Sequence, residues 1–197
     1  MYALAIHDRA SRKVVLTRDP FGIKPLYIAE TPNGIAFASE PQALIAAGLA
    51  KPTLRARAID ELMQLQFTTG ADTIFDSIRR VLPGETIVIT DGAIVERHRR
   101  AALPEGGPET ITEEEAVTRL DGALRESVDL HQRSDVPYAL FLSGGTAGAA
   151  VLAMMAQLNE RPVLAFTAGF DVPGAADERE QAARLAKAAG AEHAPVS

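Results

Sequence analysis

The 197-residue sequence contains no cysteine. This absence excludes disulfides, cysteine-ligated metal sites and a thiol nucleophile within the chain. The sequence also has no apolar run that approaches the roughly 20 residues of a transmembrane helix, so we expect no membrane partner. No secretory signal precedes the first strand-like segment, which favours a cytoplasmic location.

Positive charge is in the minority. There are 20 lysine and arginine residues against 26 aspartate and glutamate residues, giving a net charge of -6 and a pI near 5.3. This balance argues against a nucleic-acid partner, because binding to phosphate backbones depends on clusters of basic side chains. The one basic cluster, residues 97–100, is typical of a solvated strand end. A hydrophobic content of 47% predicts one large or two small globular domains.

Short apolar runs separated by turn signals fill the first hundred residues. We expect strands over residues 2–6, 13–17, 26–29 and 35–38, and short helices after Pro41 and over residues 59–66. Residues 86–95 predict a hairpin, because Asp91-Gly92 supplies the positive-φ pair of a type I′ turn. Short connections favour antiparallel pairing, so this part is predicted to be α+β.

A segment rich in proline and glycine follows, with Pro104, Gly106, Gly107 and Pro108. Such a segment is typical of a linker. We therefore divide the chain into residues 1–100, a linker over 101–111, and residues 112–197.

The hydrophobic period changes after the linker. Thr112 and Glu115 predict a capping box, and the helix that follows has its apolar residues on one face, namely Val117, Leu120, Leu124 and Val128. Two buried strands, over 138–142 and 162–167, then alternate with helices, the last over 177–189 with Gly190 as its stop. This order predicts an α/β unit with a parallel sheet. The strand over 138–142 is predicted to be buried on both faces.

Only two strands of that sheet are predicted, and the first strand begins directly after Met1. Both observations indicate a chain truncated at both ends, with open strand edges. We therefore expect self-association or a partner chain that completes the fold.

The stretch that organises the second unit is Ser143-Gly144-Gly145, between a predicted strand and a predicted helix. Backbone N–H groups at a helix start can bind an anion, and glycine lets a ligand approach the backbone without a Cβ in the way. Many such turns only connect a strand to a helix, and that alternative stays open.

This stretch resembles the phosphate loop of the ATP-pyrophosphatase superfamily, whose usual form is Ser-Gly-Gly-x-Asp-Ser. Ser143, Gly144 and Gly145 match, and residue 146 fills the free position. Ala147 stands where that superfamily has aspartate, and Gly148 stands where it has serine.

Three blocks resemble the glutamine-hydrolysing asparagine synthetase family. They are Arg18-Asp19-Pro20-Phe21-Gly22-Ile23-Lys24-Pro25-Leu26-Tyr27 with Phe37-Ala38-Ser39-Glu40; Thr73-Ile74-Phe75 with Leu82-Pro83-Gly84; and Ser134-Asp135-Val136-Pro137-Tyr138 leading into the Ser143 loop, then Asp177-Glu178 and His193. The resemblance implies the later part of a glutaminase-type domain followed by the start of an ATP-binding synthetase domain.

In that family an N-terminal cysteine releases ammonia from glutamine, and the ammonia attacks an aspartyl-adenylate made from aspartate and ATP. The resemblance implies ATP and Mg²⁺ as cofactors. By the same resemblance the nucleotide-binding positions are Leu142, Ser143, Gly144, Gly145, Thr146 and Ala168, with Ala147 and Gly148 as degenerate positions. We assign no catalytic residue and no metal ligand, because the nucleophile is absent and Ala147 offers Mg²⁺ no carboxylate. Weak nucleotide binding and impaired catalysis are the expectation.

Two other functions remain open. One is a related amide-forming enzyme, similar to β-lactam synthetase, and the other is a non-catalytic interaction module. Several polar residues in the matching blocks also have structural interpretations. We expect an ion pair between Arg18 and Asp19, surface positions for Lys24 and His193, and helix N-terminal charges at Glu40, Asp177 and Glu178.

Overall fold

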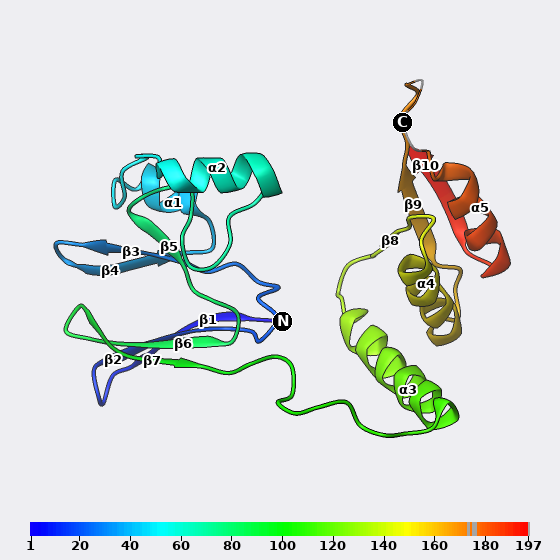
Figure 1. Cartoon of the computed structure of the whole chain (residues 1–197), viewed down its shortest axis with the longest axis horizontal. Coiled ribbons are helices and arrows are strands. Elements are labelled where there is room, and N and C mark those ends of the chain that lie inside the picture. The colour runs from blue at the N-terminus through cyan, green and yellow to red at the C-terminus, as the bar shows by residue number, and fades with distance from the viewer. Residues whose placement is uncertain (173, 175–176, 197) are drawn as a thin grey trace. The chain divides into compact units, whose positions relative to one another are not determined.

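The computed structural model describes residues 1–172, 174 and 177–196. The chain forms two compact units, Met1–Gly107 and Pro108–Ser197 (Figure 1). Each unit has its own hydrophobic core. The linker bounds at residues 101 and 111 stay a prediction.

Two antiparallel sheets build the first unit. One sheet has the order β1-β2-β6-β7, formed by β1 (Ala3–Asp8), β2 (Lys13–Arg18), β6 (Glu85–Thr90) and β7 (Ala93–Arg99). The other has the order β4-β3-β5, formed by β4 (Gly34–Ala38), β3 (Tyr27–Thr31) and β5 (Ile78–Arg80). The antiparallel α+β prediction for this part of the chain is confirmed.

The two sheets pack face to face around an apolar core. Leu16 and Ile87, neighbours across β2 and β6, contact Ile28 of β3 in one buried cluster. The opposite face of the second sheet packs against α1 (Pro41–Ala46) through Ala29, Leu44 and Ile78, and α2 (Ala56–Leu65) follows α1 in the chain. The unit is therefore layered as sheet, sheet and helices (Figure 1).

The β6–β7 turn forms as its sequence predicts. Asp91 and Gly92 have φ of 50° and 79°, the positive pair of a type I′ turn. The strands then pair from Thr90 and Ala93 outward, with a register shift at Val88 and Ile89.

The second unit alternates helices with parallel strands. Its elements are α3 (Glu113–His131), β8 (Leu140–Phe141), α4 (Thr146–Leu158), β9 (Leu164–Ala168), α5 (Arg179–Ala188) and β10 (Glu192–Val196). The sheet order is β10-β9-β8, with both pairs parallel. The predicted α/β unit with a parallel sheet is confirmed.

One face of this sheet carries the core and the other is open. Leu142, Ala165 and Leu152 of α4 lie in a buried cluster that also takes in Ala182 and Ala186 of α5. On the opposite face Phe141 is 87% exposed. The prediction of a 138–142 strand buried on both faces is therefore wrong, because β8 is a two-residue edge strand covered on one side only.

Two further details of this unit differ from expectation. The sheet has a third strand, β10, which contains Pro195 and only one β-branched residue, so its sequence gives little strand signal. The apolar stripe of α3 is also buried only in part: Val128 is buried, whereas Val117 and Leu120 are about 60% exposed. Thr112 caps α3 by accepting from the Glu115 N–H at 3.2 Å, while the Glu115 carboxylate pairs with Arg119.

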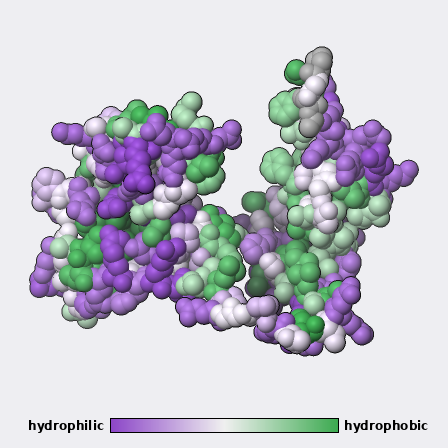
Figure 2. Space-filling model, viewed as in Figure 1, coloured by the Kyte–Doolittle hydropathy of each residue, from purple (hydrophilic) through white to green (hydrophobic). Residues whose placement is uncertain are grey.

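Apolar side chains lie among polar ones at the surface of both units (Figure 2). In the part of the chain that the structure describes, no helix has the length and apolar character needed to cross a membrane.

Candidate nucleotide site

The Ser143 loop connects β8 to α4 at the carboxyl end of the strand. Gly145 is the N-cap of α4 in an extended conformation, so Thr146, Ala147 and Gly148 form the first helical turn. Ligands of open parallel sheets bind at this edge, where strand ends and helix N-termini meet. Ser143, Gly145, Thr146 and Ala147 are exposed there, whereas Gly144 is buried.

Gly144 is held from both sides by the start of α5. Its N–H donates to Glu178 Oε2 at 3.1 Å, and its carbonyl accepts from Gln181 Nε2 at 2.7 Å. A Cβ at position 144 would lie 3.0–3.3 Å from three atoms of the Gln181 side chain. The missing side chain of Gly144 therefore makes room for α5, a role that the sequence did not predict.

Leu142 and Ala168 reach the same edge of the sheet on opposite faces. The Leu142 N–H donates to the Phe166 carbonyl at 2.8 Å, and its own carbonyl accepts from Thr167 Oγ1 at 2.8 Å. Leu142 is buried and Ala168 is exposed on the open face. Since the Leu142 N–H is engaged, its backbone has only the second lone pair of the carbonyl left for a ligand.

The described side chains around the loop do not fit a Mg²⁺ site. Ala147 contributes only a methyl group, and the Glu178 carboxylate that reaches the loop is bonded to an N–H. Within the described residues, no group of three or more His, Cys, Asp or Glu side chains is arranged to hold a metal ion. Mg²⁺ prefers an octahedron of oxygens that usually includes one or two carboxylates.

Position 148 has room for the serine hydroxyl that the superfamily carries. A Cβ there would lie 3.4 Å from Ser143 O and Oγ, which is ordinary van der Waals contact. Gly148 lies in the first turn of α4, and glycine has a lower helix propensity than the serine found at this position in the superfamily.

Asp177 and Glu178, the acidic pair before α5, have different hydrogen-bond partners. Asp177 accepts from the Arg179 N–H and guanidinium, and these bonds, with the side-chain bond the larger cause, lower the pKa of Asp177. Arg179 also pairs with Asp171 at 2.7 Å. Glu178 is the N-cap residue of α5, the position expected for a helix N-terminal charge, and its side chain also reaches the Ser143 loop.

His193 is only partly exposed and is bonded within the sheet. It lies on β10 beside Ala165 of β9, is half-buried, and its Nε2 is 2.8 Å from Thr167 Oγ1. Thr167 thereby links β10 to the Leu142 carbonyl directly before the loop. This histidine supports the base of the loop.

Arg18 and Asp19 are both buried, at 7% and 2% exposed, and both shape the turn that follows β2. Arg18 donates to the carbonyls of Gly22, Lys24 and Val81. Asp19 accepts from the N–H groups of Tyr2, Phe21, Ile23 and Lys24. The predicted ion pair between them is wrong, because each side chain binds backbone groups instead.

Burial raises the pKa of Asp19, but its four backbone donors outweigh that effect and lower the pKa to about 2. Lys24 is exposed as predicted, and Glu40 is the N-cap of α1 without a side-chain cap bond.

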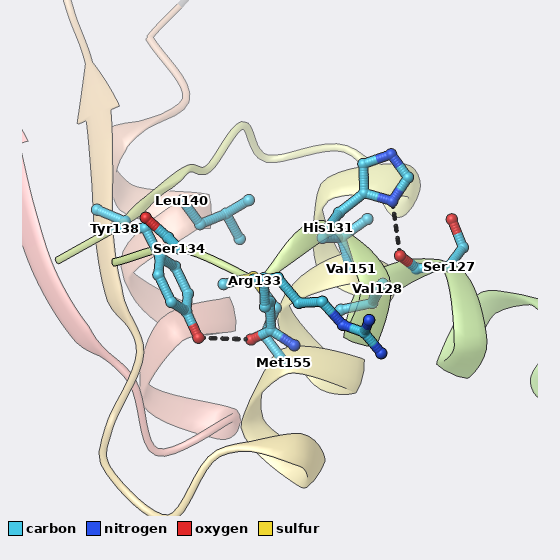
Figure 3. Close-up of a pocket in the computed structure, with 11 residues that line it drawn as sticks. Ser127, Val128, His131, Arg133, Ser134, Tyr138, Leu140, Val151 and Met155 are labelled. Atoms are coloured by element: carbon cyan, nitrogen blue, oxygen red, sulfur yellow. Dashed lines mark hydrogen bonds between the residues drawn. The ribbon is translucent and has the colours of Figure 1, made fainter. Parts of the chain in front are cut away.

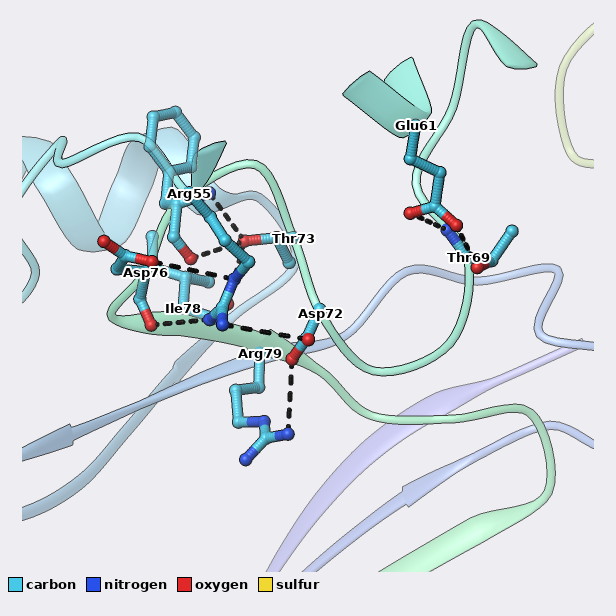
Figure 4. Close-up of polar contacts among 9 residues, drawn as sticks. Arg55, Glu61, Thr69, Asp72, Thr73, Asp76, Ile78 and Arg79 are labelled. Carbon is cyan, nitrogen blue, oxygen red and sulfur yellow. Dashed lines mark hydrogen bonds and ion pairs between the residues drawn. The ribbon is translucent and has the colours of Figure 1, made fainter. Parts of the chain in front are cut away.

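The second block of family-like sequence is also structural. Thr73 Oγ1 donates to the Ile78 carbonyl at 2.8 Å and accepts from the Phe75 N–H, while Arg55 reaches Asp72 and Asp76 (Figure 4). Gly84 has φ of +70°, and a Cβ there would lie 2.0 Å from Arg100 O. These contacts fix loops of the first unit rather than offer a reactive group.

A pocket of about 560 Å³ lies in the second unit, away from the phosphate loop. It is lined by the end of α3 and by α4 and the segment before β8, including His131, Arg133, Tyr138, Leu140 and Met155 (Figure 3). It opens near the amino end of β8, whereas ligands of open parallel sheets bind at the carboxyl ends. The exposed Ser143 loop, rather than this pocket, is therefore the candidate nucleotide site.

Comparisons with known proteins agree with this geometry. The family profile described as a glutamine amidotransferase domain matches residues 1–99, and that described as asparagine synthase matches residues 119–196. The chain belongs to the glutamine-hydrolysing asparagine synthetase family. The family therefore accounts for both units in the order in which the chain presents them.

Several curated proteins are similar to this chain over most of its length. A putative glutamine-hydrolysing asparagine synthetase of Mycobacterium bovis is 33% identical over 98% of the chain, and asparagine synthetase 1 of Bacillus subtilis is 30% identical over 88%. The amidase chyE of Penicillium rubens is 29% identical over 94%. The chain spans 30%, 27% and 29% of these relatives' own lengths, respectively.

Proposed function

We propose that the second unit is the nucleotide-binding start of an ATP-dependent amide-forming synthetase, with the Ser143 loop as its phosphate site. The observation that carries this proposal is the loop itself. It sits at the carboxyl end of a parallel strand and opens α4 through Gly145, so the N–H groups of the first helical turn have no partner within the helix, while the Gly144 N–H is bonded to Glu178. The match of residues 119–196 to asparagine synthase supports the same assignment.

The reaction we propose for the whole enzyme is amide transfer from glutamine to aspartate through an aspartyl-adenylate. The names of the mycobacterial and Bacillus relatives support glutamine as the nitrogen source. In this scheme the backbone of the Ser143 loop binds the ATP phosphates, and Ala168 contacts the adenine through its backbone. The exposure of Ala168 at the same sheet edge is compatible with that contact.

We further propose that this 197-residue chain completes neither half-reaction by itself. It contains no thiol to attack glutamine, and Ala147 leaves the phosphate loop without a carboxylate for Mg²⁺. The backbone donors need no side chain, so weak nucleotide binding is retained.

Titration calorimetry with AMP and with ATP, each with and without Mg²⁺, tests the proposal. We expect weak binding of both nucleotides and little gain for ATP from Mg²⁺. A chain that gives no binding heat under any of these conditions, while it stays folded, would contradict nucleotide binding.

A non-catalytic interaction module is the second candidate. Ala147 and Gly148, together with the absence of cysteine, favour it. The same calorimetry separates the two, because a module that only binds proteins has no reason to bind AMP.

A further inference from the structure

We infer that Glu178 is an internal competitor for the phosphate site, occupying the Gly144 N–H until a nucleotide displaces it. This inference rests on the proposed nucleotide site. It assigns to Glu178 a role in setting the affinity and the choice of ligand at that site.

The first step is the contact itself. Glu178 Oε2 lies 3.1 Å from the Gly144 nitrogen, although the two residues are 34 positions apart. A carboxylate oxygen is chemically the same kind of acceptor as a phosphate oxygen, a charged oxygen that takes an N–H donor. The chain thus already places an anion on the loop.

The second step is that Glu178 and a phosphate cannot both bond to the Gly144 N–H. A backbone N–H has one hydrogen, so it cannot donate a full bond to Glu178 and to a phosphate at the same time. Gly144 is the buried glycine of the loop, and its N–H is turned toward α5 by this bond. A phosphate that uses this donor has to replace the carboxylate.

The third step is that the loop keeps its shape when Glu178 leaves. Gln181 Nε2 holds the Gly144 carbonyl at 2.7 Å, and its side chain packs where a Cβ of Gly144 would be. Glu178 itself is exposed, so its carboxylate can move into water. The residue can be removed without removing the contact that positions the peptide.

The experiment measures binding of inorganic pyrophosphate and of AMP, both without Mg²⁺, to the 197-residue chain by ¹⁵N NMR titration that follows the Gly144 amide. The variants are Glu178→Ala and Glu178→Gln. Glu180→Gln is the matched control, because it removes a charge from the same helix where Glu180 pairs with Arg184 rather than with the loop. A thermal melt of each variant checks that it is folded.

We expect Glu178→Ala to bind both ligands about fivefold more tightly than the unmodified chain, the effect of freeing one hydrogen-bond donor. Glu178→Gln should fall between the two, since a neutral amide oxygen is a weaker acceptor, and Glu180→Gln should match the unmodified chain. A purely structural role for Glu178 would lower the melting temperature without raising affinity.

Three other outcomes overturn the inference. Equal or weaker binding by Glu178→Ala, with clear binding by the unmodified chain, would leave the nucleotide site standing and remove Glu178 from it. An equal gain in Glu180→Gln would assign the effect to overall charge. No shift of the Gly144 amide in any folded variant at millimolar ligand would overturn the proposed nucleotide site as well.

Discussion

Gly144 and Glu178 lie on different elements, and a 3.1 Å hydrogen bond from the Gly144 N–H to Glu178 Oε2 joins the loop after β8 to the start of α5. Together with the Gln181 bond to the Gly144 carbonyl, it engages both backbone polar groups of Gly144. The phosphate loop is thus shaped by a helix that begins more than thirty residues later. Its geometry depends on tertiary packing as well as on the Ser-Gly-Gly sequence.

Asp19 makes the stability of the first unit depend on pH. Its pKa is about 2 in the folded chain, below the model-peptide value of 3.8, so it stabilises the fold above pH 4 and this contribution is lost as the pH falls toward 2. We expect Asp19→Asn to lower the free energy of unfolding at pH 7 by about 2 kcal/mol. The cost should shrink between pH 5 and pH 2.

Urea unfolding of both proteins at several pH values measures this difference. Asp60→Asn is the control, because Asp60 is exposed on α2. A cost for Asp19→Asn that stays constant from pH 7 to pH 2 would show that the charge of Asp19 is not what holds the turn.

Alanine substitutions at Gly84 and Gly48 distinguish the cost of backbone strain from the cost of a steric clash. Their φ values are +70° and +71°, but only at Gly84 would a Cβ meet another group, Arg100 O at 2.0 Å. We expect Gly48→Ala to cost about 1–2 kcal/mol from strain alone. Gly84→Ala should cost about 1–3 kcal/mol more, because Arg100 has to move.

Thermal melts of the two alanine variants give the comparison directly. Equal melting temperatures would mean that the β7 end, which bonds to Gly84 through the Arg100 N–H, moves away without cost.

The edge strand β1 exposes an apolar row. Leu4 and Ile6 are 46% and 52% exposed, and Ile6 is next to Val15, which is next to Val88, on the face opposite the core. Unpaired edges with apolar side chains favour association between chains. We predict self-association that the double variant Leu4→Lys/Ile6→Lys reduces.

Light scattering over a range of protein concentrations measures the mass. Glu30→Lys changes the net charge by the same amount at an exposed polar site on β3, and should leave the mass unchanged. A concentration-independent monomer mass for the unmodified chain would contradict this prediction.

The sequence predicts the local elements well because their signals are local. Asp91-Gly92 determines its own turn, and Thr112 caps α3 through a neighbour three residues away. The strand β10 was missed because it forms only by pairing with β9, and its sequence has neither alternation nor strong β-propensity.

In the candidate site, too, local features could be predicted and tertiary contacts could not. The order of strand, loop and helix could be predicted, since it depends on adjacent residues. The contacts of Glu178 with Gly144, of His193 with Thr167 and of Asp19 with four backbone N–H groups could not, because they join distant positions or depend on backbone direction. The acidic pair Asp177-Glu178 gives no sign in sequence that its members point to different partners.

The most direct test of the account is to restore the loop with Ala147→Asp/Gly148→Ser and to measure Mg-ATP, metal-free ATP and AMP binding by calorimetry. Both positions lie in the first turn of α4, where an added aspartate complements the helix dipole, so the variant should fold. Ala153→Asp, exposed further along α4, is the charge-matched control for the aspartate. We predict Mg-ATP affinity higher on the order of tenfold, with AMP affinity nearly unchanged, because a new carboxylate acts through the metal. Unchanged Mg-ATP binding in a folded double variant would show that the Ser143 loop only connects a strand to a helix.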